Sequence, residues 1–326
     1  MPAGRSRFLG AFAALVAVTA VAVIAVVLVV RPGRGAPTPA PTPIDLAGLA
    51  SYPPVASMPP DETVTLTGAG DIASCERTDD EATAALLADL PGWVFTTGDN
   101  AYESGTAEEF EQCYDPSWGV YRERTFPAIG NHDTVTPGRQ GYFDYFGPRA
   151  GDRRAGWYAT TLGSWRLIVL DSTCVAAGGC GPDTDQGRWL AAELDAHQTD
   201  CTLAIWHHPR FSTGYHGPTL AVEPFWDALF AAGADLVVNG HDHDYERFAP
   251  VDPAGNPDPA RGIRQIVAGT GGAALRQFEE EDPNSEVRDA STSGVLRLDL
   301  RPGGYDWEFI PVAGGSFTDR ASGTCH

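Results

Sequence analysis

Five short apolar runs in this sequence each lead into polar residues of the kind that bind metal ions. Runs of this length between turn residues predict buried β-strands. They are Val64–Thr67 before Asp71, Trp93–Thr97 before Asp99, Phe126–Ile129 before Asn131 and His132, Leu203–Trp206 before His207, and Leu236–Val238 before His241. We therefore expect a sheet in which several strands end in polar side chains.

Stretches with a helical pattern lie between these runs, at residues 81–90, 187–197 and 223–232. Residues 157–162 and 165–170 have the pattern of a β-hairpin. This alternation predicts an α/β fold with added antiparallel strands. Ligands bind beyond the carboxyl ends of the strands in open α/β sheets, so residues far apart in the sequence are expected to share one site there.

Seven candidate metal ligands combine carboxylate, amide, phenol and imidazole groups, which suit hard or borderline metals, and seven ligands suit two ions. They are Asp71, Asp99, Tyr102, Asn131, His207, His241 and His243. Each alone is weak support, because a strand-end Asp is commonly a turn residue and a single His is commonly a core side chain. His241 and His243 would share one face of an extended backbone, whereas His208 would point away from its neighbour His207 and is left out of the set.

Five sequence blocks around these residues match the motifs of a known family. The blocks are Gly70-Asp71, Gly98-Asp99-Asn100-Ala101-Tyr102, Gly130-Asn131-His132-Asp133, Trp206-His207-His208-Pro209 and Gly240-His241-Asp242-His243-Asp244-Tyr245-Glu246-Arg247. Over most of residues 64–250 the sequence resembles the calcineurin-like metallophosphoesterases and, within them, the purple acid phosphatases. Within this family Tyr102 favours the purple acid phosphatases, since a tyrosinate ligand to ferric iron distinguishes them from most related phosphodiesterases. The resemblance implies a four-layer α/β/β/α sandwich.

The resemblance also implies two metal sites that share one ligand. Fe(III) would be held by Asp71, Asp99, Tyr102 and His243, and a divalent Fe, Zn or Mn ion by Asp99, Asn131, His207 and His241. His132 and His216 match family positions that contact phosphate and protonate the leaving group. Ala73 departs from the family's first motif, which usually has Gly at that position.

The function implied by the resemblance is hydrolysis of phosphoric monoesters. Metal-bound water loses a proton more easily than bulk water, so a metal-bridging hydroxide would attack phosphorus in line. A phosphodiesterase that acts on nucleotides or lipid headgroups with the same metal pair is the nearest alternative. A noncatalytic surface protein that keeps metals for structure or adhesion is a third, but it would have no need of His132 and His216 at leaving-group positions.

The charge balance narrows the classes of protein further. All 22 basic residues are Arg, so Schiff-base enzymes, P-loop nucleotidases and kinases that depend on a lysine are excluded. With 43 acidic residues the net charge is −21. A broad basic face for a nucleic acid polymer is not expected, and the expected partner is a small phosphate ester.

The N-terminal residues include Phe8–Val30, a run of 23 residues without a charge, which as a helix is about 34 Å long and can cross a bilayer. We expect residues 1–35 to be a membrane anchor or a signal segment, residues 36–62 a Pro/Thr/Ala-rich linker, and residues 63–326 the metallophosphoesterase catalytic domain. The sequence leaves open whether the apolar segment is retained or removed, and it predicts no oligomeric state.

Six cysteines follow this apolar run, at positions 75, 113, 174, 180, 201 and 325. An even number there predicts disulfides and an extracytoplasmic location, either anchored by a single membrane pass or secreted. Only Cys174 and Cys180, which flank a short Gly-rich loop, are close enough in the sequence to be paired from it. Reduced, buried thiols are the alternative.

Overall fold

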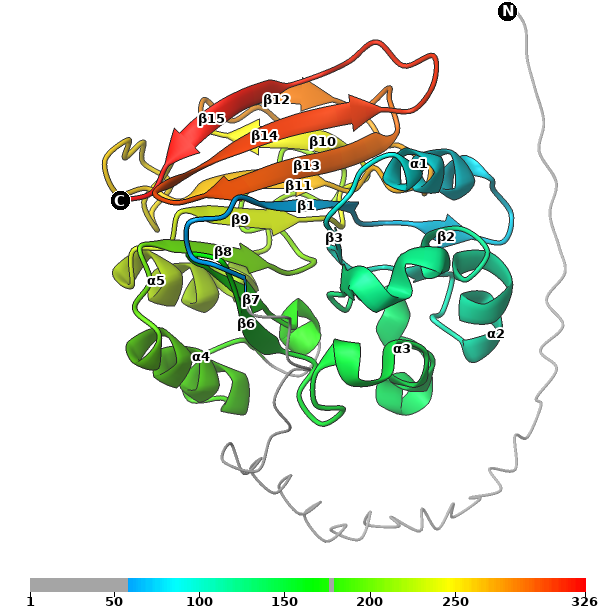
Figure 1. Ribbon diagram of the computed structural model, residues 1–326, viewed down its shortest axis with the longest axis horizontal. Coiled ribbons are helices and arrows are strands. Elements are labelled where there is room, and N and C mark those ends of the chain that lie inside the picture. The colour runs from blue at the N-terminus through cyan, green and yellow to red at the C-terminus, as the bar shows by residue number, and fades with distance from the viewer. Residues whose placement is uncertain (1–57, 176–178) are drawn as a thin grey trace, which may run out of the picture. The chain divides into compact units, whose positions relative to one another are not determined.

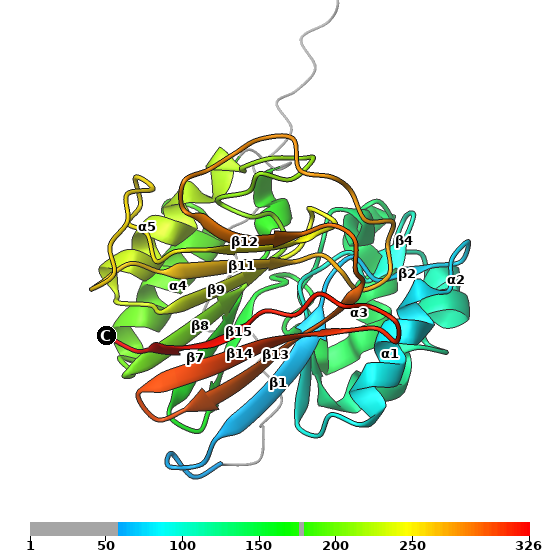
Figure 2. The same ribbon diagram turned by 90° about the horizontal axis from the view of Figure 1, so that it is seen from above.

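Two β-sheets form the core of the protein, for which a computed structural model describes residues 58–175 and 179–326. The first sheet has six strands in the order β15-β14-β13-β1-β3-β5 (Figures 1 and 2). Their bounds are β1 Val64–Ala69, β3 Trp93–Thr96, β5 Thr125–Phe126, β13 Gly294–Arg301, β14 Gly304–Pro311 and β15 Arg320–Thr324. β1, β3 and β5 run parallel, and β13 to β15 run antiparallel to their neighbours.

The second sheet has seven strands in the order β12-β10-β11-β9-β8-β7-β6. Their bounds are β6 Tyr158–Leu162, β7 Trp165–Val169, β8 Cys201–Ile205, β9 Leu236–Asn239, β10 Tyr245–Phe248, β11 Arg264–Ala268 and β12 Ser285–Asp289. β7, β8, β9 and β11 are parallel, while β6, β10 and β12 are antiparallel to their neighbours. A separate small sheet pairs β2 (Ala73–Ser74) with β4 (Ala101–Tyr102).

In the described part of the chain five α-helices accompany the sheets, with bounds α1 Asp79–Ala88, α2 Ala107–Glu109, α3 Gln140–Phe146, α4 Asp185–Ala196 and α5 Glu223–Ala231. One apolar core lies between the sheets and includes Leu298 of β13 and Leu203 of β8. A second core packs Leu87 of α1 against the outer face of the first sheet, and a third packs Trp226 of α5 against the outer face of the second. The layers therefore run helix, sheet, sheet, helix (Figure 1).

The sequence of β13 shows how a strand is fixed in the first sheet. Leu296, Leu298 and Leu300 are buried, and the charged residues between them are partly exposed. Since successive side chains of a strand point to opposite faces, this alternation turns the leucines toward the core between the sheets. β13 then pairs with β1 along five residues, from Val64 opposite Leu300 to Gly68 opposite Leu296.

The mixed α/β class expected from the sequence is confirmed, and the predicted elements agree with the observed ones to within a few residues. One exception is the predicted strand at residues 126–129, where the observed strand is Thr125–Phe126 and ends at the first residue of the predicted run. Pro127 follows directly and has no N–H to donate to a neighbouring strand, so the ladder ends there. Residues 251–326, to which we assigned no element from the sequence, supply β11 to β15 and complete both sheets.

Three disulfides join all six cysteines, as Cys75–Cys113, Cys174–Cys180 and Cys201–Cys325. The prediction of disulfides and of the Cys174–Cys180 pair is confirmed, and disulfides of this kind are typical of oxidising compartments. The expected anchor or signal segment and nearly all of the linker lie outside the described residues. Within residues 58–175 and 179–326, no helix is both long and apolar enough to cross a membrane.

Candidate metal centre

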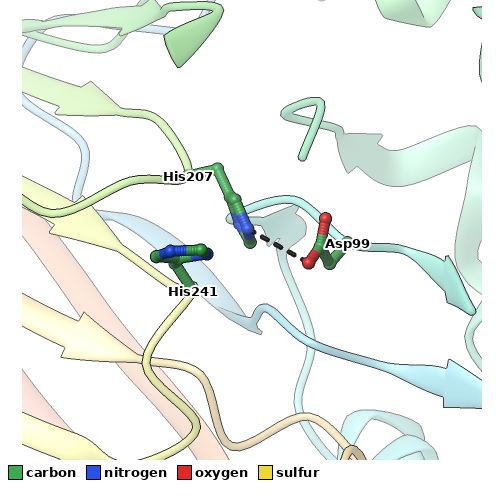
Figure 3. A group of neighbouring side chains, drawn as sticks. All are labelled: Asp99, His207 and His241. Atoms are coloured by element: carbon green, nitrogen blue, oxygen red, sulfur yellow. Dashed lines mark ion pairs between the residues drawn. The ribbon is translucent and has the colours of Figure 1, made fainter. Parts of the chain in front are cut away.

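The predicted metal ligands meet at the carboxyl ends of strands from both sheets. Asp71 follows β1 and Asp99 follows β3 in the first sheet, whereas His207 follows β8 and His241 follows β9 in the second. Figure 3 shows Asp99, His207 and His241 side by side. One ligand atom from each of these three residues lies within 4.8 Å of the others.

One group of candidate ligands consists of Asp71, Tyr102 and His243. The Tyr102 hydroxyl donates to Oδ1 of Asp71 at 2.8 Å and lies 3.3 Å from Nε2 of His243. Nε2 of His243 is 3.4 Å from Oδ1 of Asp71. All three side chains are buried, so they form a compact set of oxygen and nitrogen donors shielded from water.

A second group consists of Asp99, Asn131, His207 and His241. Nε2 of His207 lies 3.1 Å from Oδ2 of Asp99 and 3.0 Å from Oδ1 of Asn131. The rings of His207 and His241 have centroids 5.0 Å apart. Oδ2 of Asp99 is also 3.3 Å from the Tyr102 hydroxyl, so this single carboxylate oxygen contacts both groups.

The orientation of the histidine rings is set by backbone carbonyl groups. Nδ1 of His207 donates to the Thr97 carbonyl at 2.9 Å, and Nδ1 of His243 donates to the Ala274 carbonyl at 2.9 Å. In both residues Nε2 is thereby directed to the centre. Metal-binding histidines commonly have such a partner on their other ring nitrogen.

The backbone is in the left-handed region at three candidate ligands, with φ of 59° at Asp71, 50° at Asp99 and 73° at His241. Non-glycine residues rarely adopt this conformation, and such residues cluster at functional sites. The expectation of an extended backbone through His241 and His243 is wrong. The chain turns there, with the Asp242 N–H bonded to the Gly240 carbonyl at 2.9 Å, and both histidines nevertheless face the centre.

Asp133 organises the loops around the centre. Its buried carboxylate accepts from the backbone N–H of Gly130 at 2.9 Å and of Asn100 at 3.0 Å. Gly130 must be a glycine, because an added Cβ would lie 2.1 Å from Oδ1 of Asp99. The sequence reasoning gave Asp133 no role, although it is the last residue of the Gly130-Asn131-His132-Asp133 block.

Burial and mutual charge shift the pKa values of these groups. Burial opposes ionisation of Asp99, but the charges of His207 and His132 outweigh it, so the pKa of this carboxyl falls well below its usual range. For His207, burial is outweighed by Asp99, and its pKa rises to about 9. Burial, reinforced by Asp71 and Asp99, raises the pKa of Tyr102. Without a cation at the centre, Tyr102 therefore keeps its proton.

Two neighbouring histidines of the site, His241 and His208, have lowered pKa values. Burial, followed by the charges of His207 and His208, lowers the pKa of His241 strongly. Burial and His207 likewise lower the pKa of His208 to about 3. His241 is therefore neutral at physiological pH, which is the form in which imidazole binds metals.

The two predicted catalytic histidines flank the centre. The backbone N–H of His132 donates to Oδ1 of Asp99 at 2.8 Å, and its Nδ1 donates to the Glu103 carbonyl at 2.7 Å. His216 stacks on His241, with ring centroids 4.3 Å apart and an interplanar angle of 27°. Both therefore lie beside the predicted ligands.

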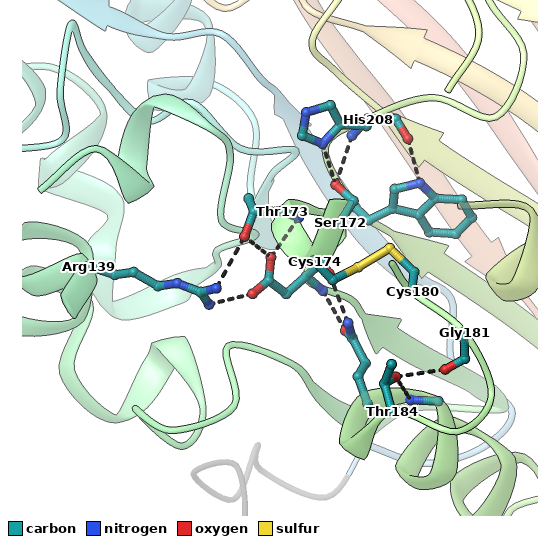
Figure 4. Close-up of a disulfide and its surroundings, with 12 residues drawn as sticks. Arg139, Ser172, Thr173, Cys174, Cys180, Gly181, Thr184 and His208 are labelled. Atoms are coloured by element: carbon teal, nitrogen blue, oxygen red, sulfur yellow. Dashed lines mark hydrogen bonds and ion pairs between the residues drawn. A yellow bond between two sulfur atoms is a disulfide. The ribbon is translucent and has the colours of Figure 1, made fainter. Parts of the chain in front are cut away.

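His208 lies next to the centre and is held by the segment between β7 and α4. The Ser172 hydroxyl oxygen is 2.8 Å from Nδ1 of His208 and accepts from the His208 backbone N–H at 3.0 Å (Figure 4). The Cys174–Cys180 disulfide closes this segment two residues further along the chain. The His208 ring is 4.4 Å from that of His241.

The described donors fit a pair of metal ions. Asp71 and Asp99 are fully buried, and no arginine is among their hydrogen-bond or ion-pair partners in the part of the chain that the structure describes. Buried carboxylates are normally paired or coordinate metals. Nε2 of His207 faces two oxygen acceptors, and a cation there would satisfy the lone pairs of all three atoms.

Comparison with known proteins identifies the family of the chain. Residues 67–245 match the family described as calcineurin-like phosphoesterase, and the chain belongs to that family. Its expected likeness to the purple acid phosphatases is also confirmed, since purple acid phosphatase 21 of Arabidopsis thaliana is 32% identical over 162 residues, covering 44% of this chain and 37% of that protein. An uncharacterized protein of Mycobacterium tuberculosis is 32% identical over 200 residues, covering 55% of this chain and 35% of that protein. The match thus spans about a third of the length of either relative.

The fold is also similar to that of a solved purple acid phosphatase. The structure of purple acid phosphatase PPD1 from seeds of yellow lupin (Lupinus luteus) superposes with a TM-score of 0.63 at 17% identity, over 81% of this chain and 54% of that one. Family membership implies a binuclear metal centre.

Proposed function

We propose that this chain is a metal-dependent hydrolase of phosphoric monoesters, similar in its chemistry to the purple acid phosphatases. The observation that carries the proposal is the position of Oδ2 of Asp99, within 3.3 Å of the Tyr102 hydroxyl and 3.1 Å of Nε2 of His207. A carboxylate between two donor groups is suited to bridge two cations.

The proposed ligands divide between the two groups of donors. Fe(III) is assigned to Asp71, Asp99, Tyr102 and His243, and a divalent Fe, Zn or Mn ion to Asp99, Asn131, His207 and His241. When bound, the two ions would supply Lewis acidity and an acidic water as nucleophile. The phenol at Tyr102 is the group that favours ferric iron, since a trivalent ion can offset the burial and the carboxylate charges that raise its pKa.

His132 and His216 are proposed to act on the substrate. Nε2 of His132 lies 4.0 Å from Oδ2 of Asp99, so a phosphate oxygen near Asp99 is within its reach. His216 is exposed and stacked on His241, so it can meet a leaving group that extends toward solvent. A proton donated there to the departing oxygen lowers the barrier to cleavage of the ester bond.

The proposed partner is a small phosphate ester, with no nucleic acid polymer, because the chain carries a net charge of −21. We propose an extracytoplasmic location, which the three disulfides support. Residues 1–35 are proposed to anchor the protein by a single membrane pass or to direct its secretion.

The test is a comparison of paired substrates with the purified full chain in detergent, loaded with iron and a divalent metal. We expect faster phosphate release from 4-nitrophenyl phosphate than 4-nitrophenol release from its bis-ester, together with a visible charge-transfer band. Faster cleavage of the diester would replace the proposal with a phosphodiesterase. No hydrolysis of either ester by a chain with full metal content would favour a noncatalytic metal-binding protein.

The double variant His132→Ala, His216→Ala separates catalysis from metal binding. We expect it to retain its metal content and to lose about 100-fold or more in kcat, because each proton-transfer group contributes about that factor. The matched control is His197→Ala, because His197 is an exposed histidine at the carboxyl end of α4. If the double variant were as active as this control, the roles assigned to His132 and His216 would be wrong.

A further inference from the structure

An arginine from the β11–β12 connection lies beside His216. Nη1 of Arg276 is 2.6 Å from Nε2 of His216, and its guanidinium stacks on the Tyr215 ring at 4.9 Å. Its backbone N–H donates to the His243 carbonyl at 2.9 Å. The connection that carries Arg276 is thus fixed directly to one of the proposed ligands.

The loop that carries His216 is fixed to the same region. The backbone N–H of His216 donates to Oδ1 of Asp242 at 2.6 Å, and the Ser212 hydroxyl donates to Oδ2 of the same carboxylate. Asp242 lies between His241 and His243 in the sequence. The positions of His216 and Arg276 are therefore set by the segment that would hold the metals.

The guanidinium of Arg276 differs from most others in this acidic protein. Within the described ranges, most arginines make an ion pair with a carboxylate, but Arg276 makes none. Among the described residues, the hydrogen bond of its side chain is made by Nη1 and goes to an imidazole. Donors remain on its other nitrogens, since a guanidinium has five N–H groups.

We propose that Arg276 is a specificity-determining residue that binds a second phosphate on the leaving group of the substrate. The proposal rests on the proposed function, in which His216 faces the leaving oxygen. A second phosphate bonded to that leaving oxygen would extend past His216 toward the guanidinium of Arg276. Planar guanidinium groups bind phosphate oxygens in pairs, so the preferred substrates are phosphoric anhydrides and bisphosphates.

The competing explanation is that Arg276 only positions His216. In that case a neutral donor at residue 276 would serve equally well, and the charge of the leaving group would not matter. Arg276→Gln separates the two, because the glutamine amide can still donate to Nε2 of His216 but carries no charge. Arg261→Gln is the matched control, since Arg261 is exposed, its guanidinium makes no ion pair within the described ranges, and it stacks on the Phe230 ring at 5.1 Å.

The experiment measures binding of two phosphonates that are not hydrolysed, methylphosphonate and methylenediphosphonate, to the full metal-loaded chain by calorimetry. We expect wild type and Arg261→Gln to bind methylenediphosphonate more tightly than methylphosphonate. Arg276→Gln should lose about tenfold or more of that preference, because it lacks a hydrogen bond between charged groups. Metal analysis after each titration establishes that the diphosphonate has not removed the ions.

Two results would overturn the proposal. The first is a wild-type chain that binds both phosphonates equally well, which is decisive even if a variant fails to fold. The second is an Arg276→Gln chain that keeps the wild-type preference. Arg276→Lys should retain part of the preference, because it keeps the charge and loses the paired donors. The calorimetric experiment involves no turnover, so it tests the role of Arg276 alone. Failure of the proposed hydrolysis would be seen in the ester assays instead.

Discussion

Nε2 of His207 lies 3.1 Å from Oδ2 of Asp99, although the two residues follow strands of different sheets, β8 and β3. In the absence of a metal this contact is an ion pair, and the same two atoms are the proposed ligands of the divalent ion. Because Oδ2 of Asp99 also contacts the Tyr102 hydroxyl, this carboxylate is expected to matter more than any other ligand.

Replacement of Asp99 by asparagine should therefore affect both proposed metals. We expect Asp99→Asn to bind fewer metal ions per chain and to lose at least about 100-fold in activity, because it removes a charge shared by two cations. Elemental analysis after gel filtration measures the first effect and ester hydrolysis the second. Asp89→Asn is the control, as Asp89 is exposed at the end of α1. Full metal content in Asp99→Asn would contradict a bridging role.

Metal binding should release the proton of Tyr102. Burial and the charges of Asp71 and Asp99 raise the pKa of this phenol, so it stays protonated in the metal-free chain at neutral pH. Binding of the proposed ferric ion would require the phenolate, and we expect Tyr102→Phe to release about one proton fewer than wild type. Titration of metal into weakly buffered protein measures the difference. Equal proton release would show that Tyr102 is not a ligand.

Gly130→Ala should weaken metal binding although it replaces none of the proposed ligand residues. An added Cβ would lie 2.1 Å from Oδ1 of Asp99 and would displace the carboxylate. We expect metal affinity to fall about 10- to 100-fold, as it does when groups that orient ligands are changed. At Gly181 an added Cβ meets nothing within 4 Å, so Gly181→Ala should bind metal like wild type. Competition with a chelator compares the three proteins.

Asp319 should be important for stability at neutral pH. It accepts from Tyr245 at 2.8 Å and from Arg247 at 2.6 Å on β10, and from Trp307 at 3.1 Å on β14, so it joins the two sheets. We expect Asp319→Ala to lose about 3 kcal/mol in the free energy of unfolding. Asp306→Ala is the control, because Asp306 pairs with Arg301 where both are well exposed and should cost less than about 1 kcal/mol.

The contribution of Asp319 should depend on pH in one direction. Burial opposes its ionisation, but the bonds from Arg247 and Tyr245 outweigh burial and lower its pKa below the usual 3.8. The stabilisation is therefore complete above 3.8 and is lost as the pH falls through the lower folded value. Urea unfolding of wild type and Asp319→Asn at a series of pH values should show the two curves converging in acid. A constant difference would refute this ion pair.

The disulfides should differ in their effect on stability. Cys201 and Cys325 are 124 residues apart and Cys174 and Cys180 only six. Loop-closure entropy predicts a loss of about 5 kcal/mol when the long loop is opened and about 2 kcal/mol for the short one. Paired Cys→Ser variants and denaturant unfolding test the order. A larger loss for the Cys174–Cys180 pair would show that entropy is not the main term.

Much of the site could be predicted from the sequence, because its ligands follow short apolar strands and are marked by adjacent glycines and histidines. The role of Arg276 could not be predicted, since no motif surrounds this residue. Its loop reaches the centre only because β11 pairs with β9 and β12 pairs with β10. The turn at His241 could not be predicted either, because a positive φ depends on packing as well as on residue type. β5 is short for a local reason, Pro127, which the sequence does show.

The pairing of β13 with β1 has a consequence for how the protein is made. On the ribosome, β1 leaves the exit tunnel more than 200 residues before its partner, and the residues matched by the family end before either β13 or β14. Pairing across such a separation is slow. A chain that still lacks β13 has no partner on that side of β1, so we expect the centre around Asp71 to assemble only when translation is nearly over.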